Sequence, residues 1–298
     1  MPDYGNPLQF GYFLTPSASN HEQILQLAVQ IEQLGLELIG IQDHPYQRRF
    51  LDTWTLSAMI AAKTSRLRIF LDVSNLPLRP PAMLAKSAAT LDLLSGGRFE
   101  LGLGAGAFWE GIVAMGGPKR TPKEAFEALE EAIQVIRTLW SDERAASFQG
   151  KYYTLRGVHP GPAPAHPIQI WIGAYGPKMM DLIGRMADGW VLTLSYISLA
   201  QIKDKQARID AAAQDAGRNP ADIRRIINIA GRITSGNSAG LLNGPIDQWV
   251  DELAMLALEY GMDTFVLGGE DISQVRHFSE EIVPEVRAVI SKQRSAFL

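Results

Sequence analysis

The chain has 298 residues, of which 46% are hydrophobic and 20% are charged, and its formal net charge is −4. This composition is typical of one large globular domain, or two small ones, with a substantial core. A net negative chain offers no basic field to nucleic acid. The lack of cysteine excludes disulfides, zinc–thiolate sites, iron–sulfur clusters and cysteine nucleophiles.

The sequence also bears on location and metals. No apolar run is long enough to cross a bilayer, and the first residues resemble no signal peptide. We therefore expect a cytoplasmic protein with neither a membrane nor a nucleic-acid partner. The five histidines are too scattered for a metal site on a helix, so no metal is expected.

Short apolar runs alternate with longer amphipathic runs along the chain. In chain order, the predicted strands are 8–13, 38–41, 67–71, 99–103, 168–172, 189–193, 225–230 and 263–267. The predicted helices are 20–34, 53–62, 81–94, 121–140, 178–186, 199–216, 246–260 and 273–291. Eight strand–helix units predict an α/β protein with a (β/α)8 TIM barrel. A doubly wound open sheet is the alternative, since it uses the same alternation.

One stretch, at about 107–167, departs from the alternation. Thr121 and Glu124 form a capping box before its long helix, residues 149–153 look like a hairpin tip, and the proline-rich segment 161–167 is a stiff connector. We interpret the chain as a single domain, 1–298, with this insertion after the fourth strand. The insertion is expected to cover a substrate.

The most informative motif is LDLLSGGRFELGLGAG at 91–106. Glycine at every second position, Gly102 to Gly106, removes the side chains from one face of a strand end. A flat ligand could fill that space, and close packing inside the barrel is the other explanation.

In a TIM barrel, chemistry gathers where strands end and helices begin. Asp43 and His44 follow the second strand, where an aspartate can accept a hydrogen bond and a histidine can move a proton. Their alternative is an ordinary turn. Asp72 follows the third strand as a ligand or a salt-bridge partner. Phe108 and Trp109 follow the fourth, as walls of an apolar substrate pocket or as core.

A second glycine-containing turn follows the fifth strand. Residues 173–178 open a helix, whose unpaired N–H groups and dipole suit a phosphate, and Lys178 adds a positive charge. The alternative is a plain strand-to-helix turn with proline in the first helical position. Asp188 lies at the opposite end of a strand and is interpreted as structural. The chain has neither a P-loop nor a serine-hydrolase elbow.

These motifs together resemble the bacterial luciferase-like family of flavin- and deazaflavin-dependent oxidoreductases. The resemblance rests on the segment 91–106, on the Asp43-His44-Pro45 turn and on IWIGAYGPKMMDLIGRMADGW at 170–190, and it extends to GMDTFVLGG at 261–269. It implies a TIM barrel with insertions after some strands. It also implies a bound FMN or 8-hydroxy-5-deazaflavin coenzyme F-420 (F420), and frequently a homodimer.

The resemblance assigns roles residue by residue. It implies that Asp43 bonds the deazaflavin ring edge, that His44 lies near its reactive face and that Asn75 meets its polar edge. A non-proline cis peptide behind the ring would be Asp72–Val73. The ring would be approached by Ala105 and Gly106, and its phosphate would be held by Gly173, Ala174, Tyr175, Gly176, Pro177, Lys178 and Met179.

One position departs from the family pattern. Deazaflavin-dependent glucose-6-phosphate dehydrogenases carry a glutamate proton donor just after the glycine strand, and the corresponding residue here is Ala107. The departure argues against sugar-phosphate oxidation and for an apolar substrate.

We therefore predict an oxidoreductase that transfers hydride between F420, or FMN, and an apolar organic substrate, with His44 catalytic. One alternative is an FMN-dependent luciferase-like monooxygenase that uses oxygen and a separate flavin reductase. A second is a cofactor-binding carrier or sensor without turnover, and a third is an unrelated barrel hydrolase or lyase.

Overall fold

A computed structural model describes residues 3–296 and has the predicted TIM barrel fold. Its parallel strands follow the order β3-β2-β1-β13-β10-β9-β8-β5, and β3 also pairs with β5. The strands are β1 (Gln9–Leu14), β2 (Leu38–Ile41), β3 (Arg68–Leu71), β5 (Phe99–Gly104), β8 (Ile170–Gly173), β9 (Gly189–Thr193), β10 (Arg224–Ile229) and β13 (Thr264–Gly268). All eight predicted strands are present within two residues of their expected ends.

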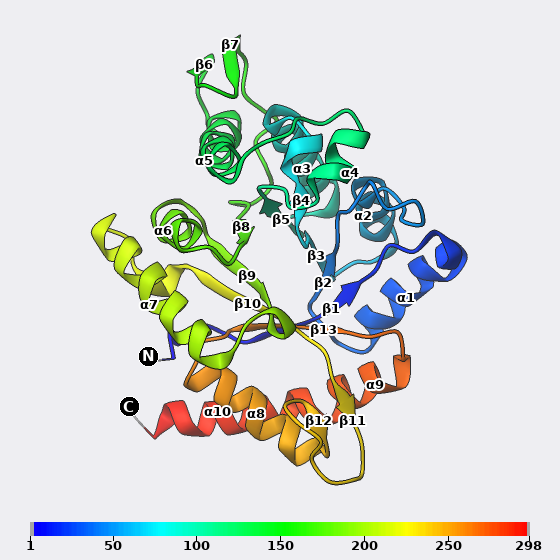
Figure 1. The fold of residues 1–298 in the computed structure, drawn as a ribbon. Helices are drawn as coiled ribbons and strands as arrows, with labels where there is room; N and C mark the ends of the chain where they lie inside the picture. Colours follow the sequence, from blue (N-terminus) through cyan, green and yellow to red (C-terminus); the bar gives the residue numbers. More distant parts are fainter. Residues whose placement is uncertain (1–2, 297–298) are drawn as a thin grey trace. The chain divides into compact units, whose positions relative to one another are not determined.

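Helices alternate with these strands (Figure 1). They are α1 (His21–Gln33), α2 (Thr53–Lys63), α3 (Pro81–Ser95), α4 (Trp109–Ala114), α5 (Pro122–Leu139), α6 (Pro177–Met186), α7 (Leu199–Asp215), α8 (Ile246–Leu258), α9 (Ile272–His277) and α10 (Val283–Ser295). The predicted capping box of Thr121 and Glu124 is present at the start of α5. The final helix predicted over 273–291 is present as an unbroken helical segment, in which a π-helical turn at Phe278–Ile282 lies between α9 and α10.

Three two-residue strands escaped prediction, because strands this short show no periodicity. Strand β4 (Ser74–Asn75) pairs with the end of β5, and β11 (Arg232–Ile233) pairs with β12 (Asn243–Gly244). The predicted hairpin is present as β6 (Ala146–Gln149) and β7 (Thr154–Val158).

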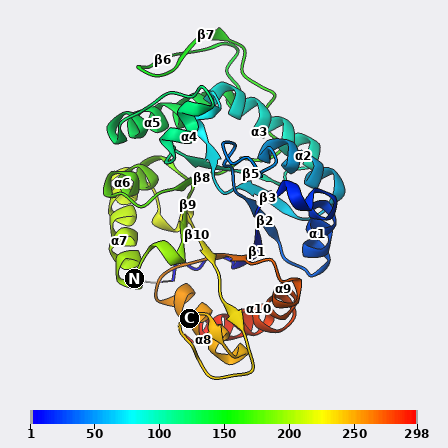
Figure 2. The same cartoon turned by 45° about the vertical axis from the view of Figure 1, so that its right-hand side comes forward.

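The chain divides into two compact units, which we describe separately. Unit 1 consists of Met1–Leu14, Val29–Gly40 and Ala174–Leu298, and unit 2 of Thr15–Ala28 and Ile41–Gly173. In unit 1, β9, β10, β13 and β1 pair in that order, and helices α8 and α10 lie side by side (Figures 1 and 2). Phe10 stacks on Phe265 and meets Phe278 edge-on, which anchors the sheet to the helices.

In unit 2, β5 lies between β3 and β8, and the Phe70 ring packs edge-on against Trp171 at 5.0 Å. The tip of the β6–β7 hairpin is fixed to α5, since the Glu131 carboxylate accepts the backbone N–H groups of residues 151–153.

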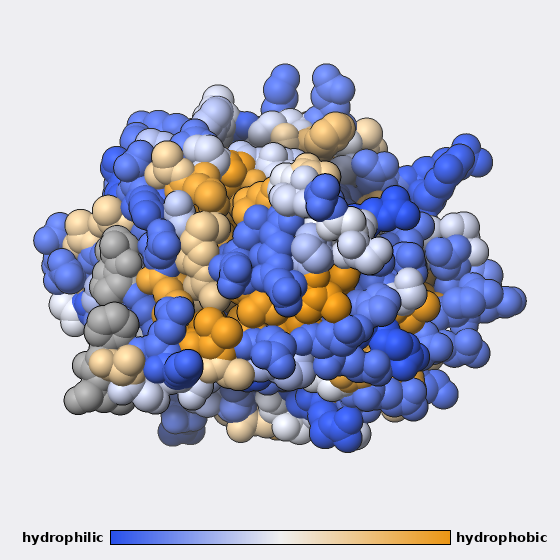
Figure 3. Space-filling model, turned by 90° about the horizontal axis from the view of Figure 1, so that it is seen from below, coloured by the Kyte–Doolittle hydropathy of each residue, from blue (hydrophilic) through white to orange (hydrophobic). Residues whose placement is uncertain are grey.

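Hydrophilic residues predominate on the surface seen from below in Figure 3, with hydrophobic patches between them.

Candidate functional site

The glycines of β5 make room for a protein side chain. A Cβ at Gly104 would lie 2.8 Å from the Val73 Cγ2 atom, and one at Gly173 would lie 3.0 Å from it. A Cβ at Gly102 would lie 1.6 Å from the Leu71 carbonyl oxygen. Close packing, the second of the two explanations considered above, therefore accounts for these glycines. The Val73 isopropyl group occupies the space that a flat ligand was expected to fill.

Val73 follows a cis peptide bond. The Asp72–Val73 bond is cis, as the family resemblance implied, and the Asp72 N–H donates to the Ile41 carbonyl. This bond lies between β3 and β4, at the carboxyl end of the strands of unit 2. It places a compact apolar side chain beside Gly104 and Gly173.

Asp43 is the centre of a polar cluster beside Val73. Its buried Oδ2 atom accepts from the Asn75 backbone N–H at 3.0 Å, from the Ser74 hydroxyl and from the Arg79 Nε–H at 3.3 Å. Arg79 also pairs with Asp52, the N-cap of α2, so its guanidinium bridges two carboxylates. Asp43 is thus held by three donors from the segment 74–79.

Two side-chain oxygens of this cluster accept no hydrogen bond from the described residues. Asp43 Oδ1 and Asn75 Oδ1 are buried, and neither has a hydrogen-bond partner among residues 3–296. An unpaired buried acceptor costs about 1–3 kcal/mol, so its presence next to a held carboxylate needs an explanation. A donor on a bound ligand would supply one.

His44 is the exposed neighbour of Asp43. Its Nδ1 atom lies 2.7 Å from the Tyr46 hydroxyl. Partial burial lowers the pKa of His44 and outweighs the Asp43 carboxylate, which raises it. Burial, assisted by Asp43, raises the pKa of the Tyr46 phenol. At neutral pH the pair is therefore an uncharged imidazole and an intact phenol.

The segment after β5 is strongly apolar and exposed. Phe108 caps α4 and has 61% of its surface exposed, while Val113 and Met115 are also largely exposed. The Phe108 ring stacks on the Tyr46 ring with centroids 5.7 Å apart. Trp109 is half-buried and packs near Gly106, where a Cβ would lie 3.1 Å from its indole. Phe108 is thus the more accessible of the two aromatic side chains.

Residues 8–237 match the family model of the luciferase-like monooxygenases. The chain belongs to this family.

Curated relatives of this luciferase-like chain include F420-dependent glucose-6-phosphate dehydrogenases from several organisms. The one from Kineococcus radiotolerans is 36% identical over 233 residues, covering 76% of this chain and 68% of the relative. The one from Amycolatopsis mediterranei is 31% identical, covering 74% and 68%. The chain is therefore an enzyme of the luciferase-like family.

Solved structures agree on the fold. An F420-dependent secondary alcohol dehydrogenase in complex with an F420–acetone adduct matches with a TM-score of 0.83 at 18% identity, covering 94% of this chain and 99% of the other. The F420-dependent tetrahydromethanopterin reductase of Methanopyrus kandleri matches with a TM-score of 0.80 at 18% identity, covering 94% and 100%. A long-chain alkane monooxygenase matches with a TM-score of 0.78, so the shared barrel serves several reactions.

The second predicted site of the luciferase-like chain, the turn before α6, begins at Gly173 in unit 2 and continues in unit 1. Three contacts fix it: Lys205 donates to the Tyr175 carbonyl, the Trp190 indole donates to the Ala174 carbonyl, and the Thr193 backbone donates to the Tyr175 hydroxyl. Gly176 caps α6, Pro177 and Lys178 begin it, and all three are exposed. N–H groups in the first turn of a helix have no partner four residues before them, so this turn fits an anion. The Met179 N–H, however, already donates to the Gly176 carbonyl.

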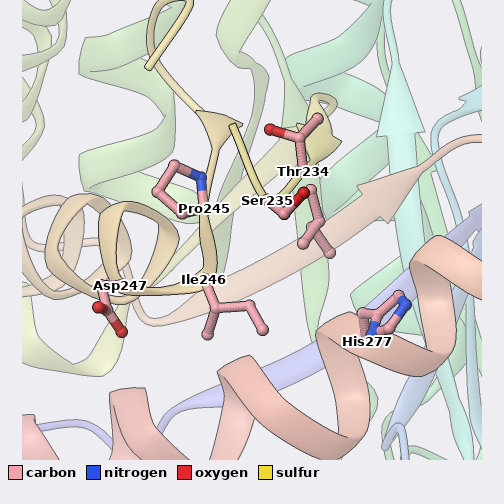
Figure 4. A pocket seen from close by; sticks show the side chains of 7 residues that line it. Thr234, Ser235, Pro245, Ile246, Asp247 and His277 are labelled. Atoms are coloured by element: carbon pink, nitrogen blue, oxygen red, sulfur yellow. The ribbon is translucent and has the colours of Figure 1, made fainter. Parts of the chain in front are cut away.

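Unit 1 also contains a pocket of about 420 Å³ that the sequence did not indicate (Figure 4). Its walls are Ile233, Thr234, Ser235, Pro245, Ile246, Asp247 and His277. His277 is paired with Glu281 one helical turn later. None of the residues predicted to bind cofactor lines this pocket, and we assign it no role.

Sequence reasoning assigned no role to three residues that contact Asp43 or His44: Ser74, Arg79 and Tyr46. Arg79 lies 36 positions from Asp43, and nothing in the spacing indicates that they meet. Tyr46 is closer, and an aromatic hydroxyl two residues after a strand-end histidine was a signal that we did not use. Asp188, interpreted as structural, does pair with Arg218. None of the helices within residues 3–296 has the length and apolar character needed to span a bilayer.

Proposed function

We propose that this luciferase-like enzyme transfers hydride between F420 and an apolar organic substrate, with the ring of the cofactor bound at Asp43, Val73 and Asn75. The bound deazaflavin supplies a carbon that gives or takes hydride. The observation that carries the proposal is the buried Oδ1 atom of Asp43, which is held in place by its neighbours and has no donor of its own among residues 3–296.

Three side chains have different roles in this proposal: Asp43, Val73 and His44. Asp43 accepts a hydrogen bond from the ring edge and leaves its second oxygen on Arg79 and the Asn75 backbone. Val73 forms a compact apolar support for one face of the ring. His44, whose imidazole is neutral near pH 7, lies next to Asp43 and exchanges a proton or a hydrogen bond with the substrate.

The proposed substrate class rests on the segment after β5. Ala107, Phe108, Val113 and Met115 are all exposed and offer no charge to a sugar phosphate. We therefore propose that glucose 6-phosphate, the substrate in the names of the curated relatives, is not the substrate here. An apolar organic substrate is consistent with this surface, and oxidation of F420H2 in the presence of a cyclic enone or of glucose 6-phosphate tests the choice.

Cofactor titration tests the proposal directly. We expect F420 to bind the purified full-length protein, with quenching of its fluorescence. Asp43→Asn should weaken binding by about 10- to 100-fold, since a hydrogen bond to a charged group is lost. Asp52→Asn is the matched control, because Asp52 contacts the same guanidinium and Asn retains the N-cap of α2.

The same titration with FMN decides between the two cofactors. Preferential binding of FMN, together with oxygen consumption when a separate reductase supplies reduced flavin, would establish the monooxygenase alternative. Binding of neither cofactor would overturn the proposal.

Three further expectations stay predictions. We propose that residues 173–179 hold the cofactor phosphate, that the protein is a homodimer and that it is cytoplasmic. Lys178→Ala should weaken F420 binding more at low salt than at high salt, because the screened charge contributes less. Light scattering measures the oligomer, and cell fractionation measures the location.

A further inference from the structure

Three aromatic side chains of unit 2 contact one another in a way that cofactor binding alone does not explain: His44, Tyr46 and Phe108. The Tyr46 hydroxyl lies 2.7 Å from Nδ1 of His44, and its ring stacks on Phe108 with an interplanar angle of 20°. The Tyr46 ring also contacts the α4 backbone, since a Cβ at Gly111 would lie 2.7 Å from Tyr46 Cγ. The Tyr46 ring is therefore packed against Phe108 and Gly111 while its hydroxyl contacts His44.

The state of the protons follows from the chemistry of the two groups. A neutral imidazole has one N–H and one acceptor nitrogen, and the partner of one nitrogen decides the state of the other. The Tyr46 hydroxyl has no second partner among residues 3–296. Either tautomer leaves one proton of the pair without a partner in this part of the chain: the phenolic hydrogen if Nδ1 is protonated, or the Nε2–H if Nδ1 accepts. A phenol is the stronger donor and the weaker acceptor of the two groups, so the bond in which the Tyr46 hydroxyl donates to Nδ1 is favoured, and the Nε2–H is left for a ligand.

We propose that Tyr46 is a positioning residue that fixes the neutral His44 ring in the tautomer with its proton on Nε2. His44 then presents a hydrogen-bond donor to the ligand. A donor at Nε2 binds an acceptor oxygen, such as the carbonyl of a ketone or enone. It does not suit a substrate hydroxyl whose proton has to be removed. The inference rests on the proposed function where it assigns His44 to the reaction.

Nitrogen NMR of the histidine-labelled full-length protein at about pH 7.5 tests the proposal without cofactor. The chain has five histidines, and His44→Gln identifies the His44 signals. We expect wild-type His44 to be protonated on Nε2 and Tyr46→Phe to show a mixture of both tautomers. Tyr152→Phe is the matched control, because the Tyr152 hydroxyl donates to Glu127 instead.

Gly111→Ala supplies an independent variant. It retains the Tyr46 hydroxyl but pushes the ring away, and it should move the His44 signals in the same direction as Tyr46→Phe. A wild-type His44 protonated mainly on Nδ1, or signals unchanged in Tyr46→Phe, would overturn the proposal.

Turnover separates this inference from the proposed function. With F420H2 and a cyclic enone, Tyr46→Phe should lower kcat about 10-fold and leave F420 affinity unchanged, since one orienting hydrogen bond is lost. If the protein binds neither F420 nor FMN, the proposed function fails while the NMR result still decides the tautomer. If F420 binds and reacts but Tyr46→Phe retains full kcat, only the positioning role fails.

Discussion

Buried carboxylates near the two ends of strand β5 differ in how completely they are hydrogen-bonded. At its amino end, both oxygens of Asp92 and both of Glu100 accept hydrogen bonds. At its carboxyl end, Asp43 Oδ1 accepts none within residues 3–296. Both sets are almost fully buried, so burial does not distinguish them.

The amino-end cluster is organised around His166. Its Nδ1 lies 2.8 Å from Asp92 and its Nε2 lies 3.1 Å from Glu100, while Arg68 also pairs with Glu100. The Asp92 carboxylate further accepts the backbone N–H of Ala165. This cluster ties the proline-rich connector to the barrel and is complete without any ligand.

The comparison separates a cluster that is complete by itself from one that a ligand could complete at Asp43 Oδ1, where we propose that the cofactor binds. Pairing every buried polar atom favours stability, so an unpaired one calls for an explanation. The following predictions test that difference, from the largest expected effect to the smallest.

Loss of the His44 imidazole should have the largest effect. His44→Ala is expected to lower turnover by about 10²- to 10⁴-fold while F420 still binds, because proton transfer is lost. Steady-state kinetics with saturating cofactor measure this, and His159→Ala, at an exposed histidine bonded to a backbone carbonyl, is the control. Near-normal turnover of His44→Ala with bound cofactor would remove His44 from the mechanism.

The same substitution, Asp to Asn, should destabilise the protein more at the amino end of β5 than at its carboxyl end. Asp92→Asn is expected to lower the free energy of unfolding by about 3 kcal/mol, since it breaks the buried pair with His166, and both Asp92 oxygens are already used by neighbouring donors. Asp43→Asn should cost less, about 1 kcal/mol, because the Asn oxygen can keep the donors of Ser74 and Asn75 while its amide takes the place of the unpaired oxygen, and only the pair with the partly exposed Arg79 is lost. Urea unfolding of both variants measures the contrast, and equal losses would contradict our comparison.

Packing at the carboxyl end can be tested through Gly104. Gly104→Ala places a methyl group against Val73 and should cost about 1–3 kcal/mol of stability, as overpacked cores do. F420 affinity should fall with it, since Val73 is displaced. Gly236→Ala, at an exposed glycine with open space around it, serves as the control. An Ala variant at 104 with wild-type unfolding would show that the glycine does not make room for Val73.

The smallest effect concerns pH. The hydrogen bond to Glu100, opposed by partial burial and aided by Asp92, raises the pKa of His166 above its ordinary value. A group with a raised folded pKa stabilises fully below its unfolded pKa, near 6.5, and loses that contribution as pH rises through the folded pKa. The stability difference between wild type and His166→Gln should therefore be largest near pH 6 and shrink at alkaline pH. A difference that is constant or grows with pH would show that His166 is uncharged in the fold.

The sequence was a good guide where local pattern decides structure. The strands 38–41 and 189–193 were predicted to the residue, and the capping box of Thr121 was read correctly, because apolar period and cap chemistry are local properties. The cis bond at Asp72–Val73 came from the family resemblance, since no spacing rule predicts it.

Tertiary contacts decided the rest. The glycine-rich end of β5 signalled an empty space, but only the folded chain shows Val73, which is 31 residues from Gly104, filling it. The same holds for Arg79 on Asp43 and for Phe108 on Tyr46. These pairs join segments brought together by the pairing of parallel strands, whose neighbours are distant in sequence.

By itself, then, the sequence determined the eight-fold alternation of strands and helices, the family and the strand ends at which chemistry gathers, since each is written in periodicity or in contiguous motifs. Only the tertiary structure decided which oxygen of Asp43 is left without a donor and which hydroxyl orients His44. Hydrogen-bond completion depends on every neighbour in space, and a linear pattern does not record those neighbours.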